Sequence, residues 1–160
     1  MKPKLYGLLA ALVIIALDQI TKAAVFSRIE TGNIEVLPFF NLVLVWNPGI
    51  SFGMLTDGIV TGPLPLILFS IAISLFFTVW LWRTDHKWLG LAIGAVIGGA
   101  LGNVIDRIRF GAVIDFLDFH VFGWHYPAFN VADSAIVLGI AFVVLDGLFC
   151  EPKRKGASKP

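Results

Sequence analysis

The sequence has little cysteine, histidine or charge: one cysteine, Cys150, and three histidines occur in 160 residues. A lone cysteine excludes an internal disulfide and any metal site built from several cysteines. Charged residues make up only 14% of the chain and hydrophobic residues 58%, whereas soluble domains carry about 25% charged residues. The composition therefore favours a single membrane-embedded domain over residues 1–160.

Motifs of several enzyme classes are also missing. The sequence has no His-Glu-x-x-His motif for zinc and no Gly-x-x-x-x-Gly-Lys loop for phosphate. His120 and His125 lie among aromatic residues, where histidines at a membrane interface are the simpler interpretation. We therefore expect no metal, no cofactor and no nucleic-acid partner.

Long apolar stretches are the main feature of the chain, and its mean hydropathy is +0.86. A helix needs about 20 apolar residues to cross a bilayer. The stretches that approach this length are 5–24, 64–82, 88–105 and 133–149. The last is short, so we expect its helix to begin a few residues earlier or the bilayer to thin around it. The predicted fold is an α-helical integral membrane protein with four transmembrane helices.

The placement of the basic residues predicts the orientation of these helices. In a four-span arrangement, one side carries Lys2, Lys4, Arg83, Lys87, Lys153, Arg154, Lys155 and Lys159, and the other carries Lys22, Arg28, Arg107 and Arg109. By the positive-inside rule, both termini and the tail 151–160 are cytoplasmic. The longer connections, 25–63 and 106–132, then face outward.

The first outward connection contains strand signals. Two short β-branched and aromatic runs, 33–37 and 40–46, are separated by Pro38 and followed by the turn signal Asn47-Pro48-Gly49. This pattern predicts a small β-sheet, with its aromatic residues at the level of the lipid headgroups.

The third apolar stretch carries glycines at a spacing of four, which places them on one face of a helix. The stripe consists of Gly90, Gly94, Gly98 and Gly102. Helices in lipid associate through such close backbone packing, so we expect another helix to lie against this face.

Polar side chains occur in pairs near the outer ends of the spans. Asp18 and Lys22 are four residues apart, as are Asn103 and Arg107, so each pair shares a helix face. For Asp18 and Lys22, an interfacial ion pair and a functional role are equally good explanations. Asp106 and Arg107 fit a membrane exit, but Asn103 lies within the span and needs hydrogen-bond partners.

Two further acids, Asp115 and Asp133, flank the second outward connection. Asn130 and Asp133 have the spacing of a helix cap and an acid at the third helical position, so capping alone explains them. Capping does not explain Asp115, which has apolar neighbours and no basic residue closer than Arg109.

Two acids close together in a poorly hydrated site resist ionising together and share one proton. The ionised acid can take a proton from water that attacks an amide, while the protonated acid polarises the carbonyl. Asp115 and Asp133 are the strongest candidates for such a pair, because the connection between them can fold back and bring them together.

Five blocks in order, together with the chain length and the four-span pattern, resemble the lipoprotein signal peptidases, also called signal peptidase II. The blocks are "DQITK" at 18–22, "WNPGISFG" at 46–53, "GGALGNVIDR" at 98–107, "GAVIDFLDF" at 111–119 and "FNVADS" at 129–134. Each block alone is a modest signal, but chance similarity does not explain five in order.

The resemblance implies an aspartyl intramembrane peptidase of the bacterial inner membrane, which cleaves prolipoproteins just before a diacylglyceryl-modified cysteine. Asp115 and Asp133 would be its catalytic pair, while Asp118 matches a motif position outside the pair. The matching site-supporting residues are Asn103, Arg107 and Asn130, and those at the outer rim are Asp18, Lys22, Asn47 and Gly49.

The resemblance also implies that 25–63 forms a small periplasmic sheet and a lid over the substrate. The expected partners are lipid-modified prolipoproteins and membrane lipid, and the protein is expected to be a monomer. The main alternative is a small proton-coupled carrier or channel that uses Asp18, Asp115 and Asp133 as a relay. A structural subunit is a third option, but it leaves the acid pair without a purpose.

Overall fold

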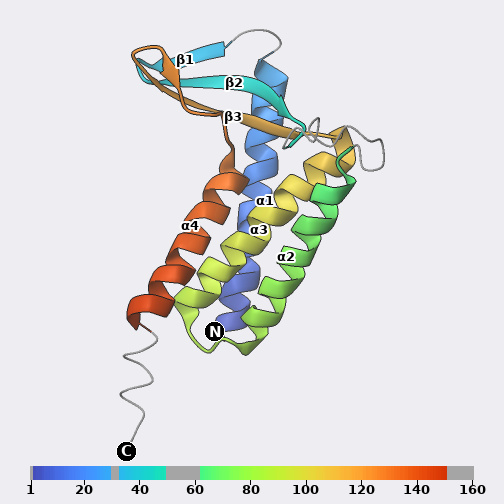
Figure 1. Cartoon of the computed structure of the whole chain (residues 1–160), viewed down its shortest axis with the longest axis vertical. Helices are drawn as coiled ribbons and strands as arrows, with labels where there is room; N and C mark the ends of the chain where they lie inside the picture. The colour runs from blue at the N-terminus through green and yellow to red at the C-terminus, as the bar shows by residue number, and fades with distance from the viewer. Residues whose placement is uncertain (1, 30–32, 50–61, 151–160) are drawn as a thin grey trace, which may run out of the picture.

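The computed structural model describes residues 2–29, 33–49 and 62–150. Four helices form a bundle there, and a small sheet lies across one end of it (Figure 1). The helices are α1 (Pro3–Arg28), α2 (Leu64–Arg83), α3 (Lys87–Phe110) and α4 (Val131–Leu145), and α4 continues into the π-helix η2 (Asp146–Cys150). Four helical segments are long and apolar enough to cross a membrane, so the prediction of four transmembrane helices is confirmed. Most of the expected lid and the tail 151–160 lie outside the described residues.

Helix ends follow local sequence signals. Pro3 begins α1, where a missing amide proton costs nothing. α3 continues to Phe110 and ends at Gly111, which adopts the left-handed conformation with φ of 77°. Asn130 caps α4, which begins at Val131, two residues before the apolar stretch predicted from the sequence. The expectation of an earlier start for the last helix is therefore confirmed.

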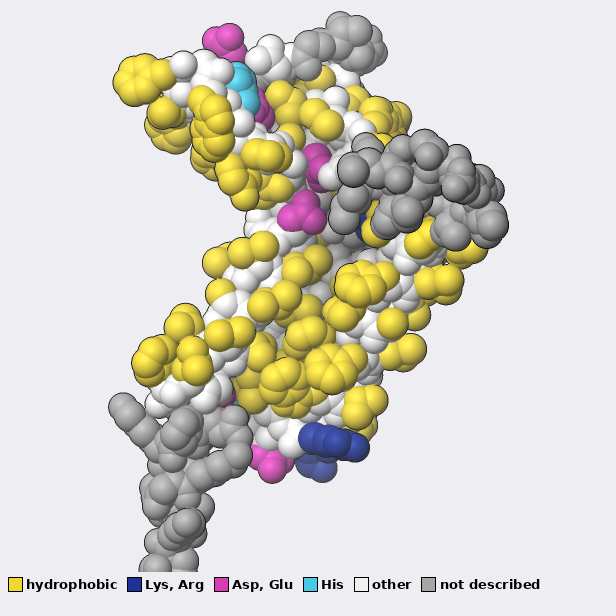
Figure 2. All heavy atoms as spheres, viewed as in Figure 1, with side chains coloured by type: hydrophobic (Ala, Val, Ile, Leu, Met, Phe, Trp, Pro, Cys, Tyr) yellow, Lys and Arg dark blue, Asp and Glu magenta, His cyan; other side chains and the backbone are white. Residues whose placement is uncertain are grey.

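α3 is the central helix of the bundle. It packs against each of the other three helices, and 67% of its most apolar window is buried. The corresponding fractions for the other helices are between 17% and 28%, so each of them leaves most of its apolar surface exposed. Figure 2 shows hydrophobic side chains covering the visible face of the bundle. Such a surface is typical of helices in contact with lipid.

The glycine stripe allows α1 to pack directly on α3, as its spacing predicts. A Cβ atom added to Gly98 would lie 2.6 Å from the carbonyl oxygen of Ala11, and one added to Gly94 would clash with the backbone of Gly7. At the outer end of the stripe, a Cβ on Gly102 would lie 2.7 Å from a carboxylate oxygen of Asp18. The last glycine thus makes room for a polar group.

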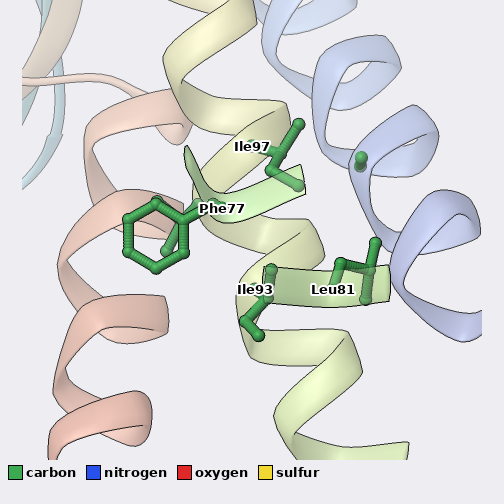
Figure 3. Packing of buried hydrophobic residues seen from close by; sticks show 6 residues of the cluster. Phe77, Leu81, Ile93 and Ile97 are labelled. Atoms are coloured by element: carbon green, nitrogen blue, oxygen red, sulfur yellow. The ribbon is translucent and has the colours of Figure 1, made fainter. Parts of the chain in front are cut away.

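α2 is held to the bundle by large apolar side chains. Leu81 and Ile93 are completely buried, and Phe77 and Ile97 belong to the same cluster. Leu81 points from α2 toward α1, while Phe77 points toward α4 (Figure 3). The cluster contacts α3 on the N-terminal side of its polar residues Asn103 and Arg107.

The sheet is antiparallel, with strands in the order β1-β2-β3-β4. β1 (Asn33–Leu37) and β2 (Phe40–Asn47) correspond to the predicted strand pair, whereas β3 (Val113–Val121) and β4 (Trp124–His125) were not predicted. In the register of β2 and β3, Asn41 lies opposite Asp118 and Val45 opposite Asp115. β3 thus carries Asp115 into the junction between sheet and helices.

Candidate active site

The connection between α3 and α4 folds back on itself and brings Asp115 to the start of α4. The backbone amides of Phe116 and Leu117 both donate to the carbonyl oxygen of Phe129, at 3.0 and 2.8 Å. The amide of Phe129 donates in return to the carbonyl of Leu117 at 3.2 Å. The residue after Phe129 is the N-cap of α4, so this pairing fixes Asp115 beside the helix N-terminus.

Asn130 joins the two acids of the expected pair. Its Nδ2 donates to Oδ1 of Asp115 at 2.7 Å, and its Oδ1 accepts from the backbone amide of Asp133 at 2.9 Å. Oδ2 of Asp133 accepts from the backbone amide of Asn130 at 3.2 Å, which completes a capping box. The capping explanation is therefore correct but partial, because the same side chain also holds Asp115.

A second amide reaches each acid from another element. Nδ2 of Asn103, on α3, donates to Oδ1 of Asp133 at 2.8 Å. Nδ2 of Asn47, at the end of β2, donates to Oδ2 of Asp115 at 2.8 Å. Oδ1 of Asn47 accepts from the backbone amide of Gly49 at 2.8 Å, which orients the Asn47 side chain. Four elements thus fix the positions of the two carboxyl groups.

The surroundings of Asp115 disfavour its charge. Its side chain is 2% exposed, and burial is the main cause that raises its pKa to about 6. The hydrogen bonds from Asn47 and Asn130 and the charge of Lys22 act in the opposite direction, while the charge of Asp133 raises the pKa further. Asp115 is therefore a carboxyl group that titrates near neutrality, which suits proton transfer.

A buried ion cluster lies beside the pair. Nζ of Lys22 is 2.8 Å from Oδ2 of both Asp18 and Asp106 and donates to Oδ1 of Asn103 at 3.1 Å. Asp18 also accepts from the backbone amide of Ala132 at 3.0 Å. Asp18 and Lys22, which were expected at the outer rim of the site, have side chains that are 0% and 3% exposed. Packing of α1 on α3 covers them.

Two members of this cluster, Asp106 and Gln19, were not predicted as site residues. Asp106 accepts from the backbone amide of Ile114 at 3.2 Å, next to Asp115, and from Nε2 of Gln19 at 2.9 Å. Gln19 lies in the "DQITK" block and Asp106 in the "GGALGNVIDR" block. Asp106 is three positions after Asn103 and shares its helix face, which is the signal that could have revealed it.

An apolar groove begins at the polar end of this site. It has a volume of about 510 Å³, and Asn47, Gly49, Asn103 and Arg107 line one end of it. Side chains of three helices line the rest, including Phe69, Ile73 and Phe77 from α2, Val96 from α3, and Ile136 and Ile140 from α4. Figure 2 shows acidic side chains in the recess where sheet and helices meet, with apolar side chains beside them. The groove suits an apolar chain whose polar end reaches the acids.

Arg107 is the cation of this site that lines the groove. Its charge interacts favourably with Asp133, Asp115 and Asp106. Its Nε is buried and has no hydrogen-bond partner among the described residues. A donor held in this position can bind an acceptor on a molecule that enters the groove.

Asp118 belongs to a different cluster farther along β3. It accepts from Nδ2 of Asn41 at 3.1 Å, and Nδ1 of His125 lies 2.9 Å from its carboxylate. Burial would raise the pKa of Asp118, but the hydrogen bonds from His125 and Asn41 and the charges of His125 and His120 outweigh it and lower the pKa. Asp118 therefore has its own partners and does not join the pair.

Residues 10–149 match the model of a protein family described as Signal peptidase (SPase) II. The chain belongs to the signal peptidase II family. It is 38% identical over 164 residues to the lipoprotein signal peptidase of Rhodopseudomonas palustris, with coverage of 97% of this chain and 99% of that protein. It is 44% identical over 140 residues to that of Burkholderia mallei, with coverage of 86% and 84%.

The fold of this signal peptidase II family member also matches solved structures. Two structures of a bacterial membrane enzyme, determined by the in meso method at 2.3 and 1.9 Å resolution, superimpose with TM-scores of 0.74 and 0.75. Both are 30% identical to the chain; the first covers 96% of it and the second 91%. The family and the four apolar helices together make the protein a membrane peptidase.

Proposed function

We propose that this peptidase removes the signal peptide from bacterial prolipoproteins by cleaving just before the diacylglyceryl-modified cysteine. In this proposal, Asp115 and Asp133 are the catalytic pair. The observation that carries it is the bridge of Asn130 between Asp115 and the start of α4, beside an apolar groove that is lined by Asn47 and Asn103, the partners of the two acids. The relatives named lipoprotein signal peptidase support the substrate class.

Hydrolysis at this site needs one proton on the pair of acids. The ionised carboxylate takes a proton from water as the water oxygen attacks the carbonyl carbon of the scissile amide. The protonated carboxyl group gives its proton to the carbonyl oxygen, so a neutral tetrahedral intermediate forms. The acid that gained a proton then protonates the amide nitrogen, and the C–N bond breaks as the other acid recovers its proton.

The remaining residues hold this arrangement. Asn103 and Asn130 orient the carboxyl groups, and Asn47 and Gly49 form the outer edge of the site. Asp18 and Lys22 support it from beneath, because Lys22 binds Asn103 and Asp18 binds the first turn of α4. The buried Nε–H of Arg107, which has no hydrogen-bond partner among the described residues, is available to the substrate backbone.

The same proposal places the protein in the inner membrane as a single-domain monomer with both termini in the cytoplasm. The acid pair then lies near the periplasmic face, where an exported prolipoprotein presents its cleavage site. The proton carrier is not favoured, because Asp18, Asp106, Asp115 and Asp133 gather at one end of the bundle. A relay would need ionisable groups spread through the membrane.

The test is cleavage of a diacylglyceryl-modified prolipoprotein by the purified protein in lipid or detergent. We expect Asp115→Asn and Asp133→Asn each to lower kcat by at least about 10³-fold, since general acid–base catalysis supplies about 10²–10⁴. Asp118→Asn is the matched control, because it makes the same change on the same strand outside the pair. A folded variant of either acid that keeps near-full rate would show that the assigned pair is wrong.

A further inference from the structure

A second cavity lies at the opposite end of the bundle from the acid pair. It has a volume of about 430 Å³ and is lined by Trp80 of α2, Leu89 of α3 and Val143 of α4 on its apolar side. Its polar side consists of Arg83, Asp85, His86 and Asp146. No residue of the proposed catalytic site takes part in it.

This cavity lies next to the apolar groove along the same three helices, although no residue lines both. On α2, the groove ends at Phe77 and the cavity begins at Trp80, and the two rings stack with centroids 5.8 Å apart. On α4, Ile140 lines the groove and Val143 the cavity, one helical turn farther on. A chain that leaves the acid pair along the groove therefore arrives at the cavity.

The cavity contains a buried acid, Asp146, which is 5% exposed. It lies where α4 passes into η2. A basic group that enters the cavity can pair with this carboxylate.

Two further groups of the cavity suit a cation with N–H donors. Nδ1 of His86 is buried and has no hydrogen-bond partner among the described residues, so it can accept from a donor when the ring is neutral. Asp85 adds an exposed carboxylate, and Arg83 is exposed as well. Among the described residues, the cavity therefore contains a buried acid, a ring nitrogen without a hydrogen-bond partner, and an exposed cation, Arg83.

The distance between the two ends matches the length of a signal peptide. Asn103 lines the groove beside the acids and Leu89 lines the cavity, and they are 14 positions apart on α3. At 1.5 Å per residue, this separation is about 21 Å. The apolar region of a signal peptide has about 7–15 residues and follows a positively charged region. A helix of about 14 such residues would place the basic region at the cavity.

We propose that this cavity binds the basic N-terminal region of the signal peptide while the groove holds its apolar region. This inference rests on the proposed function and adds a second recognition point, about 21 Å from Asn103 along α3. The Lys or Arg side chains of the substrate would bind Asp146 and Asp85, with His86 as a further acceptor. The enzyme would thus select substrates by the charge that precedes the apolar region.

The test compares two prolipoproteins that differ only in this region, one with its natural Lys and Arg residues and one with Gln in their place. We expect wild type to cleave the Gln substrate with a KM about three- to tenfold higher and an unchanged kcat, as for the loss of one or two charge-assisted bonds. Asp85→Asn and Asp146→Asn should raise KM for the basic substrate but not for the Gln substrate. Glu35→Gln, an exposed acid on β1, is the control.

Asp146 also interacts within the chain, so its variant can affect the fold, whereas Asp85 is exposed. A third variant, Asp85→Lys, is therefore tested with a substrate whose basic residues are replaced by Glu. We expect Asp85→Lys to cleave this substrate better than wild type does. Equal KM values for both substrates with wild type, or equal effects of Asp85→Asn on both, would overturn this inference alone. A wild-type protein that cleaves neither substrate would overturn the proposed function and this inference with it.

Discussion

The side-chain amide of Asn130 has one oxygen and one nitrogen, and the site uses them for different purposes. The oxygen caps α4 through the backbone of Asp133, and the nitrogen holds the carboxylate of Asp115. An aspartate could supply the cap but would repel Asp115, and a serine could not bond both groups in this way. The position of the acid pair is therefore coupled to the start of a membrane helix.

The raised pKa of Asp115 predicts the pH dependence of cleavage. A pKa of about 6 means that the protonated form is populated below that pH and is lost as the pH rises through it. If the reactive enzyme carries one proton on the pair, kcat/KM should fall about tenfold per pH unit above about 6. The measurement is kcat/KM for a diacylglyceryl-modified prolipoprotein between pH 5 and 9, a range of about four units around the pKa.

A variant of Asn47 tests the assignment of this pH dependence. The hydrogen bond from Asn47 lowers the pKa of Asp115, so Asn47→Ala should move the alkaline fall of kcat/KM to higher pH. The control is Asn41→Ala, which removes an equivalent bond to Asp118 on the same pair of strands. An alkaline limb that stays in place in Asn47→Ala would show that Asp115 does not set it.

At the scale of elements, the contact between α1 and α3 fixes the ion cluster beneath the acids. A Cβ on Gly98 would lie 2.6 Å from the carbonyl oxygen of Ala11 and 2.9 Å from Cβ of Ile14. Gly98→Ala should therefore separate the helices and lower the free energy of unfolding by up to about 2 kcal/mol. This value is the overpacking cost of about 1–3 kcal/mol minus the gain of about 1 kcal/mol from the better helix propensity of alanine.

Thermal unfolding in detergent would measure this loss. Gly147→Ala is the control for stability, because no described residue lies within 4 Å of a Cβ atom added at Gly147. The contact would be less tight than the structure shows if the melting temperature of Gly98→Ala equalled that of wild type.

The elements that could be predicted from sequence are those with a local signal. Apolar runs predicted all four helices, and short β-branched runs predicted β1 and β2. β3 was missed because its first four residues are all buried, so the alternation typical of a strand is absent there. Its partner β2 is far away in sequence, and pairing at that distance leaves no mark on either segment.

The same reason explains the errors at the candidate site. Asp106 looks like an acid at a membrane exit until α1 packs on α3 and places Lys22 against it. Asp18 and Lys22 were expected at the outer rim of the site, and their burial follows from that packing. Residue types and motif blocks thus identified the polar groups, while their burial depended on which helices meet.

At the scale of the whole molecule, the sheet and the loop between α2 and α3 lie at opposite ends of the bundle (Figure 1). The distribution of basic residues predicts that this loop is cytoplasmic and the sheet periplasmic. The proposed function depends on this orientation, because a signal peptide enters the membrane with its basic region in the cytoplasm. The reverse orientation would place the acid pair where no exported substrate presents its cleavage site.

Single cysteines introduced at the two ends would test the orientation in a Cys150→Ser background. Phe122 is fully exposed at the turn between β3 and β4, and Lys87 is exposed at the start of α3. A membrane-impermeant maleimide added to spheroplasts should label Phe122→Cys at once and Lys87→Cys only after permeabilisation. The opposite pattern would contradict both the orientation and the proposed periplasmic site.

Labelling of both variants without permeabilisation would indicate leaky spheroplasts, which a cytosolic marker protein detects. Since neither substitution changes a residue of the acid pair or the ion cluster, cleavage by the same variants shows whether the labelled molecules are folded.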